Sequence, residues 1–255
     1  MKFDHAAGDS LRSALKKCFA AVVVVAMGSV SIAQAGPSCS KVFSSLSAQE
    51  VLEGISWITE LKQFGTVKLE NLTPYGDHPD FLYLSKISGV EVIAKSLAPR
   101  FNRPSYPIEE VYFMKLLSDL GIGPKFFGVS EVKGEPVVVS QVIKGEIYHN
   151  LGDWPYKRWG MKRKADTVKQ AALGLQELAN LGVVAGDFQF FIDSNGKVYI
   201  FDTDYYFFQP VPQANKVNLR HLTKLMIDTK IISVHEERNI VSFDQAFAVI
   251  ESYSK

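Results

Sequence analysis

The sequence predicts an α+β fold with antiparallel strands, and three observations lead to this prediction. Strand-like segments follow one another with a tight turn before the first long central helix, Asn195-Gly196 separates two later apolar segments, and apolar residues recur at helical spacing over Ala165–Leu181. The 255 residues are 47% apolar and 22% charged, which favours a packed core over disorder. A net charge of +1 gives no indication of a nucleic-acid partner, and we expect none.

The first 35 residues have the order of a secretory signal peptide. A basic flank of Arg12, Lys16 and Lys17 precedes the apolar run 18–33, and Ala33-Gln34-Ala35 closes it with small residues. The run is shorter than the about 20 apolar residues that span a membrane. We therefore expect a secreted protein without stable membrane insertion after cleavage, and an uncleaved anchor helix is the alternative.

Residues 36–63 are expected to form an N-terminal extension with a helix over 45–63. A second helix is predicted from Pro107 to Gly121, because proline favours a helix start and glycine a helix stop. The strands predicted around this helix are Val67–Leu72, Phe81–Ile87, Val90–Leu97, Phe126–Val132 and Pro136–Gln141.

The second half of the chain predicts helices around one late hairpin. Apolar spacing favours a helix over Ala165–Leu181 that stops at Gly182. The segments FFID and KVYIF then flank the turn Ser194-Asn195-Gly196. Two more helices are expected around Lys216–Thr229 and Ser242–Tyr253.

Two charged residues of the first half are candidates for the nucleotide site, a lysine for the phosphates and an acid to orient that lysine. Lys95 closes the apolar strand in GVEVIAKSL, so its ammonium would project from a rigid element into a cleft. Glu110 lies one turn into the next helix, on or beside its apolar stripe, where it could pair with Lys95. Glu109 is the alternative partner, and the helical register favours Glu110.

Acidic and amide side chains gather near the late hairpin. Asp187 follows a helix, Gly182 and an apolar segment, so we expect it on a loop at the base of a cleft, with Gln189 two residues later. Asp202 and Asp204 end the hairpin in IFDTD. Such oxygen ligands suit Mg²⁺. Phosphoryl transfer needs a cation on the phosphates, an acid orienting it, oxygen ligands for magnesium and a carboxylate near the incoming hydroxyl.

Taken in order, these segments resemble the protein-kinase-like superfamily over roughly residues 64–230. VEVIAKSL resembles the strand with the nucleotide-binding lysine, and EEVYFMKLLSDLGIGPKFFGV the helix with its glutamate partner. VVVSQVIKGE resembles the segment that leads into the hinge, and LANLGVVAGDFQFFIDSNGKVYIFDTD the catalytic loop with the metal-binding aspartate. The resemblance implies a bilobal fold, with a small antiparallel-sheet N-lobe at 64–143 and a reduced, mostly helical C-lobe at 144–255.

The resemblance also implies roles for these residues. Lys95 would hold the α- and β-phosphates of ATP, Glu110 would hold Lys95, and Asp187 would be the catalytic acid/base. Asp202 would be the main magnesium ligand, with Gln189 as an amide ligand.

Further positions would serve the nucleotide and the metal. Asp204 would be an additional metal ligand. Ser140 would stand at the gate of the adenine pocket, and backbone groups of Gln141 and Ile143 would bind the adenine edge. Gly76 would lie in the loop that covers the phosphates.

The chain departs from the family pattern in ways that favour a shortened enzyme. Ala185-Gly186-Asp187 stands where His-Arg-Asp is usual, Ile192 stands where an asparagine is expected, and Thr203-Asp204 replaces Phe-Gly after the metal-binding aspartate. No Ala-Pro-Glu follows, and residues 203–255 are too few for a full C-terminal lobe. This layout resembles minimal bacterial effector kinases, with the Hop-type effectors that phosphorylate a eukaryotic heat-shock chaperone as the nearest likeness.

The expected function is therefore a secreted, monomeric protein kinase that uses ATP and Mg²⁺ to phosphorylate a host protein. A serine or threonine hydroxyl is the favoured acceptor, and a heat-shock chaperone is the target that the resemblance implies. Three alternatives stay open: a catalytically inactive kinase fold that binds a partner, a small-molecule phosphotransferase of the aminoglycoside type, and another transfer chemistry such as adenylylation.

Overall fold

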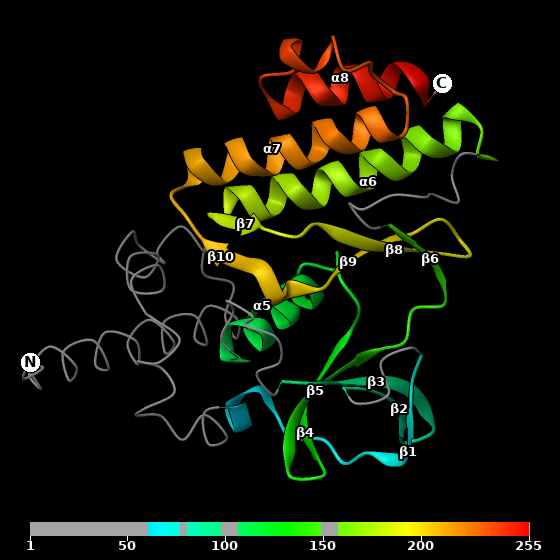
Figure 1. Cartoon of the computed structure of the whole chain (residues 1–255), viewed down its shortest axis with the longest axis vertical. Coiled ribbons are helices and arrows are strands. Elements are labelled where there is room, and N and C mark those ends of the chain that lie inside the picture. The colour runs from blue at the N-terminus through cyan, green and yellow to red at the C-terminus, as the bar shows by residue number, and fades with distance from the viewer. Residues whose placement is uncertain (1–60, 77–80, 98–106, 149–157, 255) are drawn as a thin grey trace, which may run out of the picture.

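The computed structural model describes residues 61–76, 81–97, 107–148 and 158–254, and these form an α+β fold (Figure 1). The strands are β1 (Glu70–Pro74), β2 (Leu82–Ile87), β3 (Val90–Ser96), β4 (Phe126–Val132), β5 (Glu135–Gln141), β6 (Gly145–Tyr148), β7 (Val183–Ala185), β8 (Gln189–Asp193), β9 (Val198–Phe201) and β10 (Tyr206–Phe208). The α-helices are α5 (Pro107–Asp119), α6 (Met161–Asn180), α7 (Val211–Asp228) and α8 (Phe243–Tyr253), and the short 3₁₀ helices are η2 (Lys62–Phe64), η4 (Thr203–Tyr205) and η5 (Glu237–Asn239). The predicted signal peptide, 1–35, and residues 36–60 of the predicted extension lie outside the described residues.

The first part of the chain is an antiparallel sheet with the strand order β1-β2-β3-β5-β4. Ser88 and Gly89 both have positive φ and make the tight turn between β2 and β3, as the sequence predicted. Helix α5 connects β3 to β4 and ends before Gly121, whose φ of 70° allows the chain to leave the helix. We call β1–β5 with η2 and α5 the sheet part.

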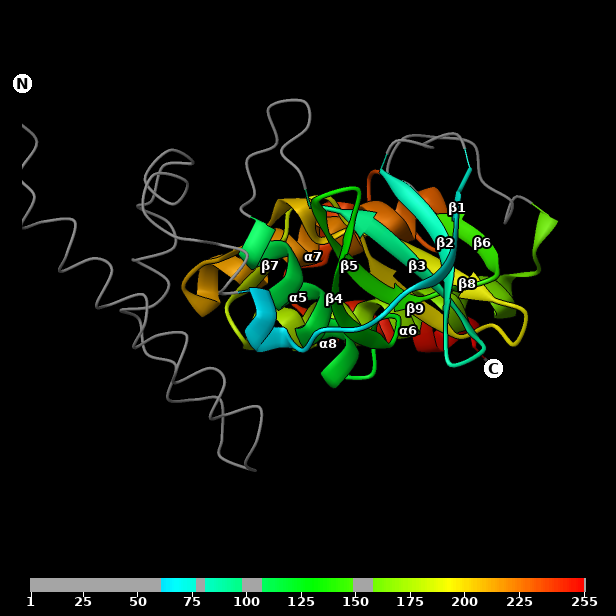
Figure 2. The ribbon, with the colours of Figure 1, turned by 90° about the horizontal axis from the view of Figure 1, so that it is seen from below.

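The first strand begins later than the sequence predicted, at Glu70 instead of Val67. Residues 65–67 instead pair with β4 at the opposite edge of the sheet, where the Val67 N–H donates to the Val129 carbonyl at 2.9 Å. The chain then crosses one face of the sheet to reach β1, and Val67 and Leu69 pack on the buried residues of that face (Figure 2). The alternating apolar residues of this segment therefore pack against the sheet where the chain crosses it, and only the last part of the segment forms a strand.

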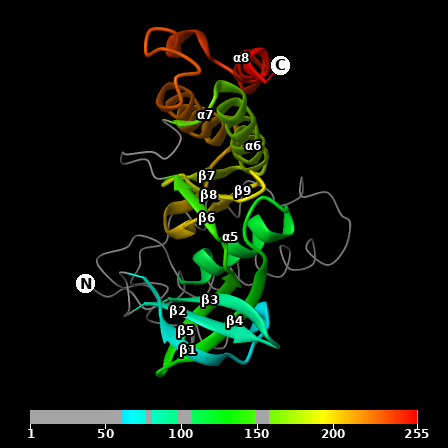
Figure 3. The ribbon, with the colours of Figure 1, turned by 90° about the vertical axis from the view of Figure 1, so that its right-hand side faces the viewer.

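The second part of the chain, which we call the helical part, contains β6–β10 and α6–α8. Figures 1 and 3 show its three helices on one side of the short strands, with α5 between these strands and the sheet part. The strands form two small antiparallel sheets, β6-β8-β9 and β7-β10. The hairpin β8–β9 turns at Asn195-Gly196 as predicted, and the Asp193 carboxylate accepts hydrogen bonds from the N–H groups of Asn195 and Lys197. The sequence did not predict β6 and β10.

The helices of the second part start earlier than, or close to, the predicted positions. Helix α6 begins at Met161, in a first turn of mostly basic residues, and α7 begins at Val211, in a first turn whose first three residues are exposed. Helix α8 begins beside Ser242, whose Oγ accepts from the Gln245 N–H at 3.3 Å. In the described part of the chain, the helices are too short or too polar to cross a membrane.

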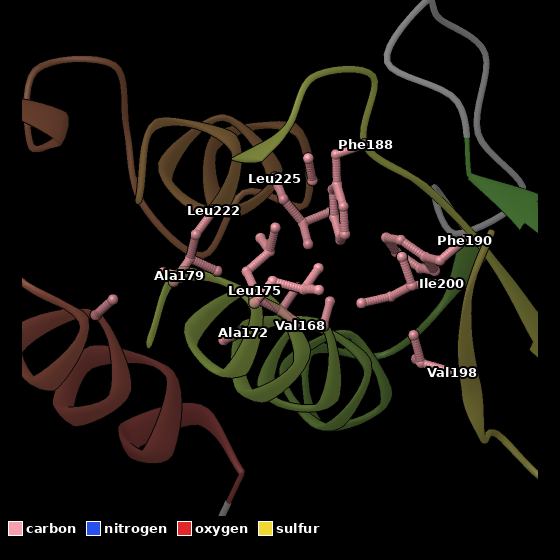
Figure 4. Packing of buried hydrophobic residues seen from close by; sticks show 14 of the residues in the cluster. Val168, Ala172, Leu175, Ala179, Phe188, Phe190, Val198, Ile200, Leu222 and Leu225 are labelled. Atoms are coloured by element: carbon pink, nitrogen blue, oxygen red, sulfur yellow. The ribbon is translucent and has the colours of Figure 1, made fainter. Parts of the chain in front are cut away.

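A single apolar cluster fills the helical part (Figure 4). The central side chains of α6 and α7, among them Leu175 and Leu222, are fully buried and belong to the same cluster as Phe190 and Ile200 of the hairpin. Burial of this apolar surface is the main stabilising contribution here, at about 25 cal/mol per Å².

Helix α5 belongs to the cores of both parts. Its residues Phe113 and Leu117 join the cluster of the helical part, whereas Ile108 and Val111 join a smaller cluster beneath the sheet. The position of α5 is therefore set from both sides, and this helix carries Glu110.

Candidate active site

Lys95 lies near the end of β3 with its ammonium among three carboxylates. Its Nζ is 2.8 Å from Glu110 Oε1, 3.0 Å from Asp202 Oδ1 and 2.5 Å from Asp204 Oδ1. Strand β3 is paired with β2 on one side and with β5 on the other, so the lysine projects from a strand held on both edges. The predicted meeting of the early lysine with the late aspartates is thus present.

Lys95 stays charged in this setting. Burial by itself lowers the pKa of the Lys95 ammonium, but the charges of Glu110 and Asp202 outweigh burial and raise this pKa above its usual range. Three carboxylates already surround this one ammonium and repel any further anion. A phosphate would therefore bind beside Lys95 only if other cations share the site.

Glu110 is the acidic residue of α5 that reaches Lys95, as the register predicted. Its side chain is 7% exposed and lies in the first helical turn, where the helix dipole also favours a negative charge. The backbone oxygen of Glu110 accepts a hydrogen bond from Thr203 Oγ1 at 3.1 Å. Both the carboxylate and the backbone of this residue are therefore tied to other parts of the site.

Asp202 and Asp204 flank a sharp change of chain direction after β9. Asp202 has φ 59° and ψ 73°, a left-handed conformation that aspartate tolerates better than most residues. The following residues form η4, which turns Asp204 towards Lys95. The Asp202 side chain is 26% exposed, whereas that of Asp204 is 3% exposed. Of the two aspartates, Asp202 is the one that solvent or a ligand can reach.

Asp187 and Gln189 lie together after β7. Gln189 Nε2 donates to Asp187 Oδ2 at 2.6 Å. Gln189 begins β8 and pairs with Phe201, the residue before Asp202, so these two predicted metal ligands lie at the same end of the hairpin. The fit at Gly186 is close, because a Cβ there would lie 2.1 Å from the Tyr205 backbone oxygen. Only glycine allows the Asp187 loop to approach η4 this closely.

Asn218, which the sequence did not predict as a site residue, supports the loop that carries Asp187. Its Oδ1 accepts from the Ala185 N–H at 3.1 Å, and its Nδ2 donates to the carbonyls of Val183 and Leu175. The side chain is fully buried on α7. An asparagine four residues from Ala214 and from Leu222, on the apolar face of a helix, was the signal that could have identified it.

Tyr206 and His221 lie close enough to the site carboxylates for the charge of Asp187 to act on both. The Tyr206 hydroxyl is buried and has no hydrogen-bond partner within the described ranges, and burial followed by the charges of Asp202 and Asp187 raises its pKa. Burial lowers the pKa of His221, and the Asp187 charge offsets part of this effect. Neither residue was predicted from the sequence, because both reach the site only through tertiary contacts.

The residues predicted to bind adenine lie at the end of β5. Ser140 is buried between Ile93 and Phe126 on the neighbouring strands. The Gln141 N–H donates to the Lys125 carbonyl at 2.8 Å, so an adenine edge would have to use the Gln141 carbonyl oxygen. Ile143 is half-buried just after the strand.

Gly76, the predicted phosphate-loop residue, lies in the turn after β1. Its φ is 63°, and a Cβ placed there would contact nothing within 4 Å. Residues 77–80 of the same loop lie outside the described residues, so the covering of the phosphates stays a prediction.

The oxygen atoms of Asp202 and Gln189 are of the kind that bind magnesium. One lysine faces three carboxylates, which leaves a net formal charge of −2 in this cluster before Asp187 is counted. Within the described residues, no group of three or more Asp, Glu, His or Cys is arranged to hold a metal ion. Mg²⁺ commonly uses one or two carboxylates together with water and substrate phosphates, a pattern that Asp202 and Gln189 could serve.

A groove of about 740 Å³ lies elsewhere, between α7 and the segment that leads into α8. Its lining includes Arg220, Val241 and Phe243, and none of the predicted site residues contributes to it. The chemistry of the carboxylate cluster is therefore separate from this groove.

A scan against protein-family models found no match to the chain, and a search of curated proteins found none either.

Proposed function

We propose that the chain is an ATP- and Mg²⁺-dependent protein kinase with a reduced, kinase-like bilobal layout. The observation that carries this proposal is the contact of Lys95 with both Glu110 and Asp202, which come from α5 and from the end of the β8–β9 hairpin. A lysine, its acidic partner and a carboxylate that can reach a metal ion are the parts that phosphoryl transfer requires.

The arrangement of the elements supports the same proposal. Helix α5 follows β3 and precedes β4 along the chain, and β5 leads directly towards the helical part. The Asp187 loop, the hairpin and Asp202 follow in the order that the kinase-like resemblance implies. The sheet part would be the N-lobe and the helical part the C-lobe.

Each residue has a distinct task in the proposed reaction. Lys95 would donate to oxygen atoms of the α- and β-phosphates, and Glu110 would keep the ammonium in place. Asp187 would orient the acceptor hydroxyl and take its proton. Asp202 and Gln189 would hold Mg²⁺, which supplies charge stabilisation to the phosphates when it is bound.

The nucleotide base and the protein target define the remaining surfaces. Backbone groups at Gln141 and Ile143 would receive the adenine edge behind Ser140. The serine or threonine acceptor on a host protein, with a heat-shock chaperone as the first candidate, rests on the family resemblance and on the export signal expected at 1–35.

The test is transfer of labelled γ-phosphate to protein by the Asp202→Ala variant. Loss of the metal ligand is expected to reduce transfer by at least about 100-fold, since such a ligand contributes several kcal/mol in the transition state. The matched control is Asp193→Asn, which changes an aspartate at the turn of the same hairpin. Transfer by Asp202→Ala at the wild-type rate would refute the assignment.

Parallel assays separate the alternatives. Phosphorylation of aminoglycosides instead of proteins would identify a small-molecule phosphotransferase, and a mass increase corresponding to AMP on the target would identify adenylylation. Mg-ATP at 100 times its dissociation constant should stabilise a nucleotide-binding fold by about 2.7 kcal/mol. The absence of any thermal shift with Mg-ATP would favour an inactive fold that binds a partner.

A further inference from the structure

We infer that Thr203 and Asp204 form a built-in latch that holds α5 and Lys95 in their working positions before any nucleotide binds. This inference rests on the proposed function for its catalytic meaning. The contacts themselves are present in the protein without ligand, and they can be tested without any activity. Thr203 and Asp204 are thus positioning residues in this scheme.

The latch consists of a closed ring of contacts between three elements. Thr203 Oγ1 donates to the backbone oxygen of Glu110, and the Glu110 carboxylate contacts the Lys95 ammonium. Lys95 in turn contacts Asp204, which is the neighbour of Thr203 on η4. Movement of β3, α5 or η4 relative to the other two breaks at least one of these contacts.

The burial of the two latch residues distinguishes them from Asp202. Thr203 is fully buried and the Asp204 side chain is 3% exposed, whereas the Asp202 side chain is 26% exposed. The ammonium of lysine has three N–H donors, and three carboxylates surround that of Lys95. A phosphate can therefore gain a donor only when one carboxylate withdraws, and Asp202, with the longest contact and the most exposed side chain, is the one placed to do so.

Aromatic packing reinforces the latch on the side of α5 away from the sheet. The Phe113 ring centroid lies 5.2 Å from that of Phe208 and 5.9 Å from that of Tyr206, and Tyr112 lies 5.7 Å from Phe208. These partners belong to β10, which follows η4 directly. The same short segment thus holds α5 by a hydrogen bond, by the lysine and by ring contacts.

The connection after the latch is very short. Only Gln209 and Pro210 lie between β10 and the first residue of α7. Strand β10 is also paired with β7, immediately before Gly186. Nothing between Asp202 and α7 is long enough to be ordered by a separate event, so the latch forms together with the aromatic packing that also holds α5.

The first experiment measures amide hydrogen exchange in α5 of the nucleotide-free protein for Thr203→Val. Loss of the hydroxyl is expected to increase exchange over Val111–Leu117 by about tenfold or more, and Thr203→Ser should restore the wild-type rate. The matched control is Thr229→Val, because Thr229 is another buried threonine that donates to helix carbonyls, at the end of α7. Unchanged exchange in α5 for Thr203→Val, in a folded protein, would overturn the latch.

The second experiment tests Asp204 through the reactivity of Lys95. Asp204→Asn removes one charge partner, so acetylation of Lys95 by an amine-reactive ester is expected to become about threefold faster or more. Asp228→Asn is the control, since Asp228 pairs with Lys224 far from the ring. Acetylation of Lys95 at the wild-type rate in Asp204→Asn would contradict the inference.

These readouts fail separately from the proposed function. Suppose that the wild-type protein binds no Mg-ATP, while Thr203→Val raises amide exchange in α5 and Asp204→Asn speeds acetylation of Lys95. The latch is then supported and the kinase proposal fails. If Mg-ATP binds and phosphate is transferred while both readouts stay at wild-type values, the kinase proposal stands and the latch is refuted. For an active enzyme, the latch also predicts a higher KM for ATP in Asp204→Asn with a smaller change in kcat.

Discussion

The sheet part and the helical part of the molecule are stabilised in different ways. The helical part has one continuous cluster that joins α6, α7, α8 and the short strands. The sheet part has two small clusters on opposite faces of the sheet, one of them beneath α5. A thin sheet with a divided core has less buried apolar surface to fix its position, so contacts at the boundary between the parts matter more for it.

This difference explains where the polar chemistry lies. Lys95 comes from the sheet part, Asp202 and Asp204 come from the helical part, and Glu110 comes from the helix shared by both. Charges inside either apolar cluster would have to overcome a large desolvation cost. At the boundary they are paired with one another, and they connect the two parts.

The largest expected effect comes from breaking the continuous core. Leu175→Ala should lower the free energy of unfolding by about 2–5 kcal/mol, because Leu175 is fully buried in the centre of α6 and its loss leaves a cavity. Urea unfolding followed by circular dichroism measures the change. Leu173→Ala on the same helix is the control, since Leu173 is 51% exposed. Equal costs for the two variants would show that the cluster does not dominate stability.

A smaller effect is expected from Asn218, which connects the helical core to the Asp187 loop. Asn218→Ala leaves the Ala185 N–H and the Val183 carbonyl without their side-chain partner, at a cost of about 1–3 kcal/mol in unfolding free energy. Asn215→Ala, on the half-buried face of the same helix, is the comparison. A cost for Asn215→Ala as large as that for Asn218→Ala would argue against this support.

The smallest effect is the pH dependence of stability, which has opposite signs for His221 in the helical part and Lys95 in the sheet part. Burial lowers the pKa of His221 in the helical part, so its contribution to stability is present above the unfolded pKa of about 6.5 and is lost as the pH falls through the folded pKa. The raised pKa of Lys95 acts in the opposite direction, because its contribution is present below about pH 10.4 and is lost as the pH rises through the folded pKa.

Unfolding midpoints measured between about pH 5 and pH 8 test the histidine. His221→Gln should flatten the decline in stability towards acid pH, whereas substitution of the exposed His235 by glutamine should leave this decline in place. A slope that stays unchanged in His221→Gln would assign the acid sensitivity to other groups.

The sequence predicted the elements whose signals are local. Helix α5, the β2–β3 turn and the β8–β9 hairpin carry their own caps, glycines or apolar spacing, and the structure confirms them. The pairing of Lys95 with Glu110 was predictable because strand end and helix register each restrict where the side chain points.

The features that the sequence missed depend on distant partners. Strand β10 has three residues and exists because β7, about twenty residues earlier, pairs with it. Strand β6 likewise depends on β8. The local sequence around Thr203, a threonine between two aspartates, does not indicate its role. That role is a hydrogen bond to a helix more than ninety residues away in the chain.

The sharing of α5 between two cores has a consequence for chemical inhibitors. A small molecule that needs a pocket behind a displaced α5 would have to separate Phe113 from Phe208 and expose apolar surface of both clusters at once. Compounds that bind without moving α5 do not have to expose this apolar surface. Screening against this protein should therefore favour molecules that leave α5 in place over those that displace it.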